Sequence, residues 1–185
     1  EGDGPFVYAD TASTRAGIAI AAGRLAGQRI AIVGLGGTGA YVLDFLAKTP
    51  VAEIHLYDSD WLHQHNAFRY PGAVPFEALQ NGLTKVEYLA GEYGQIHRSV
   101  RAHPAMIDSG NVGELASFDA VFVCVDRGET RKLISETLLA SGTVVFDTGM
   151  GVQLNPESSL FAIVRMSVVD PHTGRDALRS MPLAA

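Results

Sequence analysis

The sequence predicts an α/β fold of the Rossmann-like, doubly wound type, in which helices cover both faces of a mainly parallel sheet. Three observations predict it. Short apolar runs alternate along the chain with segments whose apolar residues recur at helical spacing. The apolar runs are nearly continuous, as in strands that are buried on both faces of a parallel sheet. The first run, RIAIVG, stops at a cluster of glycines, which is typical of a strand that turns tightly into a helix.

The first half of the chain supplies two strands of this pattern. Residues 11–25 favour a helix, because a threonine or serine near its start can cap the alanines, isoleucines and leucine that follow. Residues 29–34 predict a strand, and residues 39–49 predict the helix after it. A second strand over 52–58 ends in an acid. Residues 59–75 are polar, aromatic and interrupted by proline and glycine, which indicates a long loop.

The second half continues the alternation. Helical spacing predicts two helices, over 83–97 and 128–141. Apolar runs predict four further strands, over 99–107, 118–126, 143–149 and 159–168. In a sheet of this kind ligands bind beyond the carboxyl ends of the strands, so the residues that follow the strands are the candidates for function.

Composition limits the classes of protein that need to be considered. Of 185 residues, 47% are hydrophobic and 18% are charged, which is a globular balance for one α/β domain. The formal net charge of −6 disfavours nucleic acid as a partner. The start of the sequence lacks the pattern of a signal peptide, and its apolar runs are shorter than the ~20 residues that cross a bilayer. With a single cysteine, these features predict a cytoplasmic protein that does not bind membranes.

Three regions are expected along the chain. Residues 1–28 form an N-terminal helical segment, and residues 29–170 form the nucleotide-binding domain that the motifs below define. Residues 171–185 show little pattern, and we expect a tail or the start of a further region there.

The glycine cluster GLGGTG predicts a phosphate-binding turn. Its glycines allow a backbone with positive φ and let N–H groups approach a phosphate, which the start of the next helix also favours. Asp58 follows 19 residues after the last of these glycines and ends a strand, where a carboxylate can accept the ribose hydroxyls. The four glycines of the turn are Gly34, Gly36, Gly37 and Gly39. These residues predict a bound nucleotide but leave open whether it is a dinucleotide or ATP.

The loop after Asp58 carries more polar groups than a dinucleotide requires. Arg69 and Lys85 can neutralise a triphosphate, and Asn66 is a neutral donor and acceptor between them. Asp126, after the strand VFVCV, is a suitable single-carboxylate ligand for Mg²⁺. Each residue alone also has a plainer interpretation, as a surface charge or, for Asp126, as the cap of the helix near residue 128. Their expected convergence on one edge of the sheet favours ATP.

The stretch IAIVGLGGTGAYVLDFLAKTPVAEIHLYDSDWLHQHNAFR resembles the ThiF/MoeB family of adenylyltransferases, which share their nucleotide domain with ubiquitin-activating enzymes. The family pattern is a doubled-glycine turn, Asp-x-Asp after a strand, Asn-x-x-Arg, a lysine on the next helix, and a later Cys-x-Asp with an arginine five residues beyond. The matching residues are Gly34, Gly36, Gly37, Gly39, Asp58, Asp60, Asn66, Arg69, Lys85, Cys124, Asp126 and Arg131. The resemblance covers roughly residues 26–150.

The resemblance implies that ATP is consumed. In this family a C-terminal carboxylate, often that of a small ubiquitin-like or sulfur-carrier protein, attacks the α-phosphorus of ATP and pyrophosphate leaves. Asp58 would hold the ribose, and Asp126 would hold Mg²⁺. Asn66, Arg69 and Lys85 would neutralise and orient the phosphates. The implied role of Asp60 is to orient the loop, that of Arg131 is to pair with nearby acids, and the implied assembly is a homodimer.

Some residues depart from the family pattern. Members often supply an arginine from an N-terminal helix, sometimes across a dimer interface, and Arg15 is the nearest candidate here. Cys124 lies in an expected buried strand, where a thiol is a poor nucleophile, so thioester transfer is not expected within these residues. The zinc-binding Cys-x-x-Cys pairs of many members are absent from the sequence. The histidines His55, His63 and His65 lack the spacing of a metal site.

Two other functions remain open. A nicotinamide-dependent oxidoreductase would explain the glycine turn and Asp58, but it would leave Arg69, Lys85 and Asp126 without a role. A non-catalytic partner subunit of an activating enzyme would be expected to have a degraded ATP site.

Overall fold

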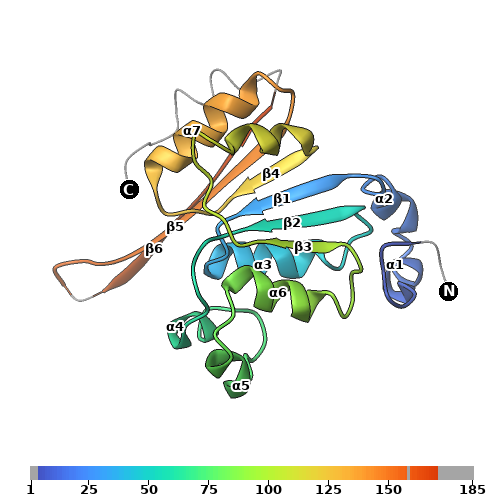
Figure 1. The fold of residues 1–185 in the computed structure, drawn as a ribbon, viewed down its shortest axis with the longest axis horizontal. Coiled ribbons are helices and arrows are strands. Elements are labelled where there is room, and N and C mark those ends of the chain that lie inside the picture. The colour runs from blue at the N-terminus through green and yellow to red at the C-terminus, as the bar shows by residue number, and fades with distance from the viewer. Residues whose placement is uncertain (1–3, 158, 171–185) are drawn as a thin grey trace.

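The computed structural model describes residues 4–157 and 159–170. Its single sheet has the strand order β3-β2-β1-β4-β5-β6 (Figure 1). The strands are β1 (Arg29–Val33), β2 (Glu53–Tyr57), β3 (Val100–His103), β4 (Ala120–Val123), β5 (Val144–Leu154) and β6 (Leu160–Val169). The helices are α1 (Thr11–Arg15), α2 (Ala19–Gly23), α3 (Gly37–Leu46), α4 (Gln64–Ala67), α5 (Phe76–Gln80), α6 (Lys85–Tyr93) and α7 (Gly128–Leu139), with a 3₁₀ helix, η1 (Val112–Ser117).

The sheet is parallel except at one edge. Strands β1 to β5 pair in parallel, and β6 pairs antiparallel with β5. The core lies on both faces of this sheet. Ile32 and Leu56 pack under α3 and α6 on one face, and Val121 and Val145 pack under α7 and η1 on the other (Figure 1). The predicted doubly wound, mainly parallel fold is therefore confirmed.

The strand order reverses between β1 and β4. From β1 the chain proceeds outward through β2 and β3, then crosses back to β4 on the other side of β1. The carboxyl ends of β1 and β4 therefore form the switch point at which sheets of this type bind ligands. The glycine turn follows β1, and Asp126 lies just beyond β4.

The N-terminal helix differs from its prediction. Residues 11–25 form α1 and α2 instead of one helix, because Gly17 adopts a positive φ of 69° and ends α1. The predicted threonine or serine cap is also wrong. Asp10 caps α1 by accepting hydrogen bonds from the backbone N–H groups of Ala12 and Ser13. A side-chain hydrogen bond with Ser13, together with the backbone bonds from Ser13 and Ala12, stabilises the charged form of Asp10 and lowers its pKa.

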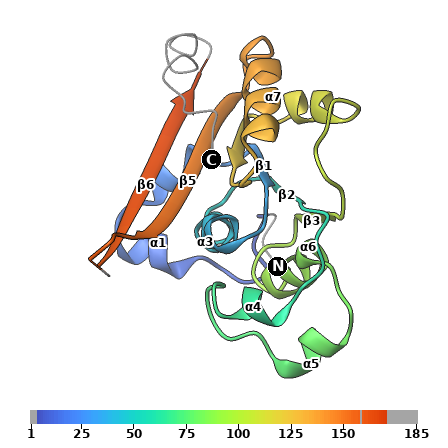
Figure 2. The same ribbon diagram turned by 90° about the vertical axis from the view of Figure 1, so that its left-hand side faces the viewer.

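The predicted loop over 59–75 contains a short helix, α4, whose start is fixed by a capping box between His63 and Asn66. Helix α5 follows it, with Pro75 at its N-cap position. Strand β5 runs past its predicted end at residue 149 to Leu154 because β6 pairs with it throughout. Residues 150–154 and 160–164 thus form a two-stranded ribbon, here called the β5–β6 arm. In Figure 1 the arm extends beyond the ends of β1 and β4, and in Figure 2 it lies to one side of α3.

Across residues 4–157 and 159–170, none of the helices is long and apolar enough to cross a membrane. The proposed tail at 171–185 lies outside the described residues.

Candidate nucleotide site

Two glycines of the turn are required by close packing. Gly34 has a φ of 91°, and a Cβ atom there would lie 2.9 Å from the carbonyl carbon and oxygen of Cys124 and from the nitrogen of Val125. A Cβ on Gly39 would overlap the carbonyl oxygen of Gly34. Any larger residue would push the turn after β1 away from the turn after β4, so these glycines hold the two sides of the switch point together.

The other two glycines leave the start of α3 accessible. Gly36 is the N-cap of α3, and a Cβ there would meet nothing within 4 Å. Among the described residues, no side chain caps this helix. Unpaired N–H groups at the start of a ten-residue helix, beside an open backbone, form a ready site for a phosphate. A Cβ on Gly37 would lie 3.4 Å from Cβ of Arg69, which places that arginine next to the turn.

Asp58 fastens the glycine turn to the end of β2. Its Oδ2 accepts a hydrogen bond from the backbone N–H of Leu35 at 2.7 Å, and its Oδ1 accepts one from the N–H of Asp60 at 2.9 Å. The phenol of Tyr70 donates to the carbonyl of Leu35 at 2.9 Å. Leu35 is therefore held on both sides, and Asp58 shapes the turn in addition to the ribose-binding role expected from the sequence.

Lys85 lies at the same edge, as the first residue of α6. A capping box between Thr84 and Glu87 fixes the start of this helix. Nζ of Lys85 is 2.6 Å from Oδ2 of Asp60 and 3.5 Å from the carboxylate of Asp58, and only 9% of its side chain is exposed. The hydrogen bond from Lys85 lowers the pKa of Asp60. Asp60 is thus the ion-pair partner of Lys85, a more definite role than the sequence indicated.

Asn66 is fully buried and only half satisfied. Its Oδ1 accepts a hydrogen bond from the N–H of His63 at 2.9 Å. Within the described part of the chain, its Nδ2 has no hydrogen-bond partner. A buried donor without a partner costs free energy, so Asn66 is suited to bind an acceptor such as a ligand oxygen.

Arg69 is an available cation. Arg69 is exposed, and within residues 4–157 and 159–170 its guanidinium makes neither a hydrogen bond nor an ion pair.

The aromatic side chains on either side of Arg69 differ in burial. Tyr70 is buried and packs the loop, whereas Phe68 is 86% exposed.

Asp126 is an exposed acid in the bend after β4. It does not cap α7, because the N-cap position belongs to Arg127 and no described side chain caps that helix. In the described ranges, its carboxylate makes no hydrogen bond or ion pair. Because Cys124 and Val125 pack directly on Gly34, Asp126 lies close to the glycine turn. A free carboxylate at this place fits a Mg²⁺ ion bound mainly by water and phosphate oxygens.

Cys124 is unsuited to nucleophilic chemistry. Its Sγ lies 3.1 Å from Oγ1 of Thr148, and burial raises the pKa of the thiol to about 11. A thiol that stays protonated at neutral pH is a weak nucleophile, which supports the expectation from the sequence.

Two other arginines, Arg15 and Arg131, differ from Arg69 in position or in pairing. Arg15, on α1, is exposed, and Figure 1 shows α1 at the end of the sheet opposite to the carboxyl ends of the strands. Within one chain, therefore, Arg15 does not join the other candidates. Arg131, on α7, forms an ion pair with Asp147 on β5 at 2.5 Å, as the sequence implied. Asp147 and its second partner Arg165 were not among the residues predicted from the sequence, although an acid inside the apolar run VVFDTG was a signal.

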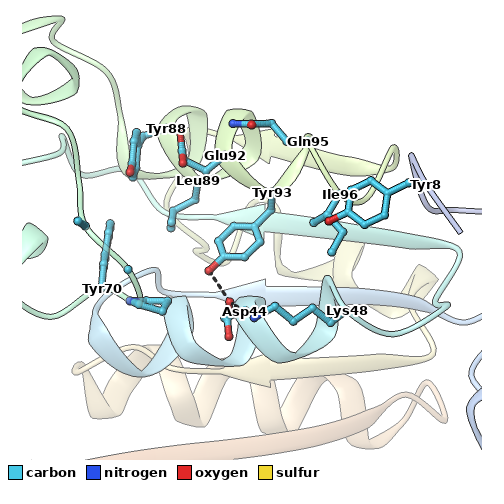
Figure 3. A pocket seen from close by; sticks show the side chains of 13 residues that line it. Tyr8, Asp44, Lys48, Tyr70, Tyr88, Leu89, Glu92, Tyr93, Gln95 and Ile96 are labelled. Atoms are coloured by element: carbon cyan, nitrogen blue, oxygen red, sulfur yellow. Dashed lines mark hydrogen bonds and ion pairs between the residues drawn. The ribbon is translucent and has the colours of Figure 1, made fainter. Parts of the chain in front are cut away.

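A groove of about 650 Å³ lies apart from these residues (Figure 3). It is formed by α3, α6 and the loop after Tyr70, and several tyrosines line it. Tyr93 donates a hydrogen bond to Asp44 there at 3.0 Å. Of the residues at the nucleotide site, the groove includes only Tyr70, so it forms a separate feature of the α3–α6 layer.

The histidines singled out in the sequence lie in two places. His55 on β2 bonds to His103 at 2.8 Å and to Glu53 at 3.1 Å. His63 is the N-cap residue of α4 and His65 lies within that helix, with ring centroids 5.8 Å apart.

This fold and site define a nucleotide-binding α/β domain: an open turn and helix start at the switch point, surrounded by an amide, a guanidinium and a carboxylate that have no partner among the described residues. The chain belongs to the ThiF family, whose sequence profile matches residues 17–162.

Known proteins are similar to the chain at moderate identity. It is 28% identical over 134 residues to "Adenylyltransferase and sulfurtransferase UBA4" of Eremothecium gossypii, which covers 70% of this chain and 30% of that protein. It is 27% identical over 163 residues to "SAMP-activating enzyme E1" of Haloferax volcanii, which covers 83% of this chain and 59% of the relative. The chain thus spans about a third of the first of these proteins and somewhat over half of the second.

Solved structures agree on the fold. The tRNA N6-threonylcarbamoyladenosine dehydratase TcdA of E. coli superposes with a TM-score of 0.68 at 24% identity, covering 78% of this chain and 60% of that one. The MccB protein of E. coli superposes with a TM-score of 0.63 at 20% identity, covering 72% and 40%. At these identities the likeness establishes the shared architecture.

Proposed function

We propose that the protein is an ATP-dependent adenylyltransferase that activates a carboxylate, the C-terminus of a ubiquitin-like or sulfur-carrier protein, and releases pyrophosphate. One observation carries the proposal: Asn66 Nδ2, the Arg69 guanidinium and the Asp126 carboxylate are all without partners in the described chain, beside the open start of α3. An amide donor, a cation and an acid are what a triphosphate with a metal ion requires. The names of UBA4 and the SAMP-activating enzyme support the choice of reaction and of substrate.

In this proposal different residues bind the phosphates and the ribose of ATP. The N–H groups at the start of α3, with Arg69 and Asn66, bind the phosphates and stabilise the charge that develops as the oxygen of the substrate carboxylate bonds to the α-phosphorus. Asp58 accepts from the ribose while it keeps Leu35 in place. In this proposal Lys85, whose ammonium lies between Asp58 and Asp60, would neutralise and orient the phosphates.

Asp126 would hold Mg²⁺, which neutralises charge on the departing pyrophosphate when it is bound. The bond between the α-phosphorus and the bridging oxygen breaks as the acyl–oxygen–phosphorus bond forms, so the protein contributes positioning and charge rather than a covalent intermediate. The high pKa of the Cys124 thiol fits this division.

The first test compares nucleotides. We expect ATP with Mg²⁺ to raise the melting temperature of the chain, because a ligand that binds only the folded state stabilises it, and we expect NAD and NADP to have no effect. Differential scanning fluorimetry measures this without knowledge of the acceptor. Stabilisation by NAD or NADP alone would favour an oxidoreductase, and no response to any nucleotide would favour a non-catalytic partner subunit.

Several features of the assembly are part of the proposal. Residues 29–170 act as the adenylation domain, and residues 1–28 act as an N-terminal helical segment that carries Arg15. Because α1 lies at the far end of its own sheet, Arg15 would reach phosphates only from a second copy of the chain. We propose a homodimer in the cytoplasm, where ATP is available and Cys124 stays reduced.

The β5–β6 arm provides a surface for this dimer. One face of the paired strands presents six apolar side chains that are each 58% to 75% exposed: Met150, Val152, Leu154, Leu160, Val164 and Met166. At roughly 100 Å² each, they offer on the order of 600 Å², close to the about 800 Å² that one partner contributes to a standard interface. An uncharged apolar face matches a second copy of itself, as a two-fold interface requires.

We expect Val152→Asp to convert a dimer into a monomer, because it places a charge in the centre of this face. Light scattering after size-exclusion chromatography measures the mass. Gln153→Asp is the matched control, since Gln153 lies next to Val152 but points to the opposite face of the ribbon, and it should leave the dimer intact. A wild-type monomer, or a dimer that survives Val152→Asp, would contradict this assignment.

A further inference from the structure

The turn that carries Asp126 keeps one backbone bond to the sheet, from the N–H of Cys124 to the carbonyl of Val33 on β1 at 2.8 Å, and beyond it is held by side chains. The parallel pairing of β4 with β5 ends at Val123 and Asp147. Beyond it, Oγ1 of Thr148 donates to the carbonyl of Val123 at 3.3 Å, and Nη2 of Arg131 donates to the carbonyl of Val125. The residue that follows that carbonyl is Asp126, so the direction of this peptide depends on Arg131.

On its other side the same turn has no free space. Cys124 and Val125 lie so close to Gly34 that a single added Cβ would come within 2.9 Å of them. The turn after β4 is therefore clamped between the glycine turn and Arg131. A loss of the bond to Val125 would release one side of this clamp and let Asp126 move.

Arg131 is itself oriented by a buried acid. Its Nη1 lies 2.5 Å from Oδ1 of Asp147, and its Nη2 also donates to the carbonyl of Thr148 at 3.1 Å. Asp147 is 1% exposed, and its second oxygen accepts a hydrogen bond from Nη2 of Arg165 on β6 at 2.9 Å. Because each oxygen of Asp147 accepts a hydrogen bond from an arginine, the carboxylate keeps one orientation. This orientation in turn fixes the plane of the Arg131 guanidinium.

We infer that Arg131, Asp147 and Arg165 form a positioning unit that aims Asp126 at the nucleotide phosphates and their metal ion. The inference rests on the proposed function and adds to it. Arg165 belongs to the antiparallel edge strand, which the phosphate-binding motifs do not include, and it acts through Asp147 and Arg131 without touching the substrate. Partners of this kind around a metal ligand govern metal affinity by fixing the orientation of that ligand.

The test separates metal-dependent from metal-independent binding of ATP. We expect Arg165→Met to weaken binding of ATP in the presence of Mg²⁺ by about 10-fold or more, as losses of such partners do. Binding of ATP in EDTA, which depends on the α3 start and Arg69, should change by less than about 2-fold. Dissociation constants from isothermal titration calorimetry give both values. Hydrogen exchange of the free protein should be faster over residues 124–128 in the variant.

Two further variants make the result specific. Lys132→Met removes an exposed cation from the same helix as Arg131 and should behave as wild type. Arg165→Lys keeps the charge but loses the planar guanidinium. Its dissociation constant for ATP with Mg²⁺ should lie between those of wild type and Arg165→Met. Arg165→Lys replaces Arg165→Met if that variant does not fold.

Equal weakening of ATP binding with and without Mg²⁺ would show a general structural role and overturn the inference, as would unchanged binding in Arg165→Met. A wild-type protein whose ATP binding does not depend on Mg²⁺ at all would instead contradict the proposed function of Asp126.

Discussion

Replacement of Asp126 by alanine should abolish ATP–pyrophosphate exchange, with a loss of at least ~10²- to 10³-fold, which is the scale for removing one preorganised electrostatic group from a reaction centre. Asp126 is the exposed acid at the switch point that has no partner in the described chain. Without it, the charge on the leaving pyrophosphate would lose its metal-bound compensation. The loss should appear in the rate of exchange and not in the stability of the free protein, since no described contact of the folded chain depends on this carboxylate.

Exchange is measured with labelled pyrophosphate, ATP, Mg²⁺ and a carboxylate acceptor. Binding of ATP with Mg²⁺, followed by thermal stabilisation, should fall in parallel and needs no acceptor. Glu136→Ala is the control, because it removes an exposed acid from α7 at a distance of two to three turns from the bend. Normal exchange in Asp126→Ala would remove the metal assignment.

Lys85→Met should impair both activity and folding. Its ammonium lies between Asp58 and Asp60 with little exposure to solvent, so methionine would fill its volume but leave two carboxylates without their cation. We expect exchange to fall by ~10²-fold or more and the free energy of unfolding at pH 7 to fall by about 1–3 kcal/mol. Most of the destabilisation should come from Asp58, because Asp60 is 67% exposed and its share is screened by water.

The destabilisation should also depend on pH. Lys85 holds the pKa of Asp60 below its usual value, so the pair contributes stability above the unfolded pKa of Asp60, near 4, and loses it as pH falls through the lower folded pKa. The share of the difference between wild type and Lys85→Met that comes from Asp60 should therefore be present at pH 7 and be lost in acid, so that the whole difference is smaller at pH 3. Urea denaturation at pH 7 and at pH 3 measures it.

Lys48→Met is the matched control, since Lys48 is 55% exposed and its side chain makes, in the described part of the chain, only an i,i+4 ion pair with Asp44. Lys48→Met should lower the free energy of unfolding by no more than about 0.5 kcal/mol. A destabilisation of Lys85→Met no larger than this, or one that grows in acid, would contradict the role given to the buried lysine.

Much of the fold could be predicted from local pattern. The strand RIAIV, the glycines after it and the helix from Gly37 were visible because apolar periodicity and φ freedom depend on a few adjacent residues. The break at Gly17 was missed because glycine is also compatible with a helix interior at modest cost. The length of β5 was missed because its last residues are held by β6, which a local pattern does not register.

The sequence by itself determined the α/β architecture, the glycine turn after the first strand and the membership in the ThiF family, since ordered motifs and hydrophobic spacing are properties of the chain read in order. Tertiary structure alone decided which of the charged residues are free. Lys85 is neutralised by Asp60, and Arg131 by Asp147, whereas Arg69 and Asp126 remain unpaired in the described chain. The physical reason is that an ion pair forms between residues that the fold brings within a few ångströms, and the separation of such residues along the chain carries no information about that distance.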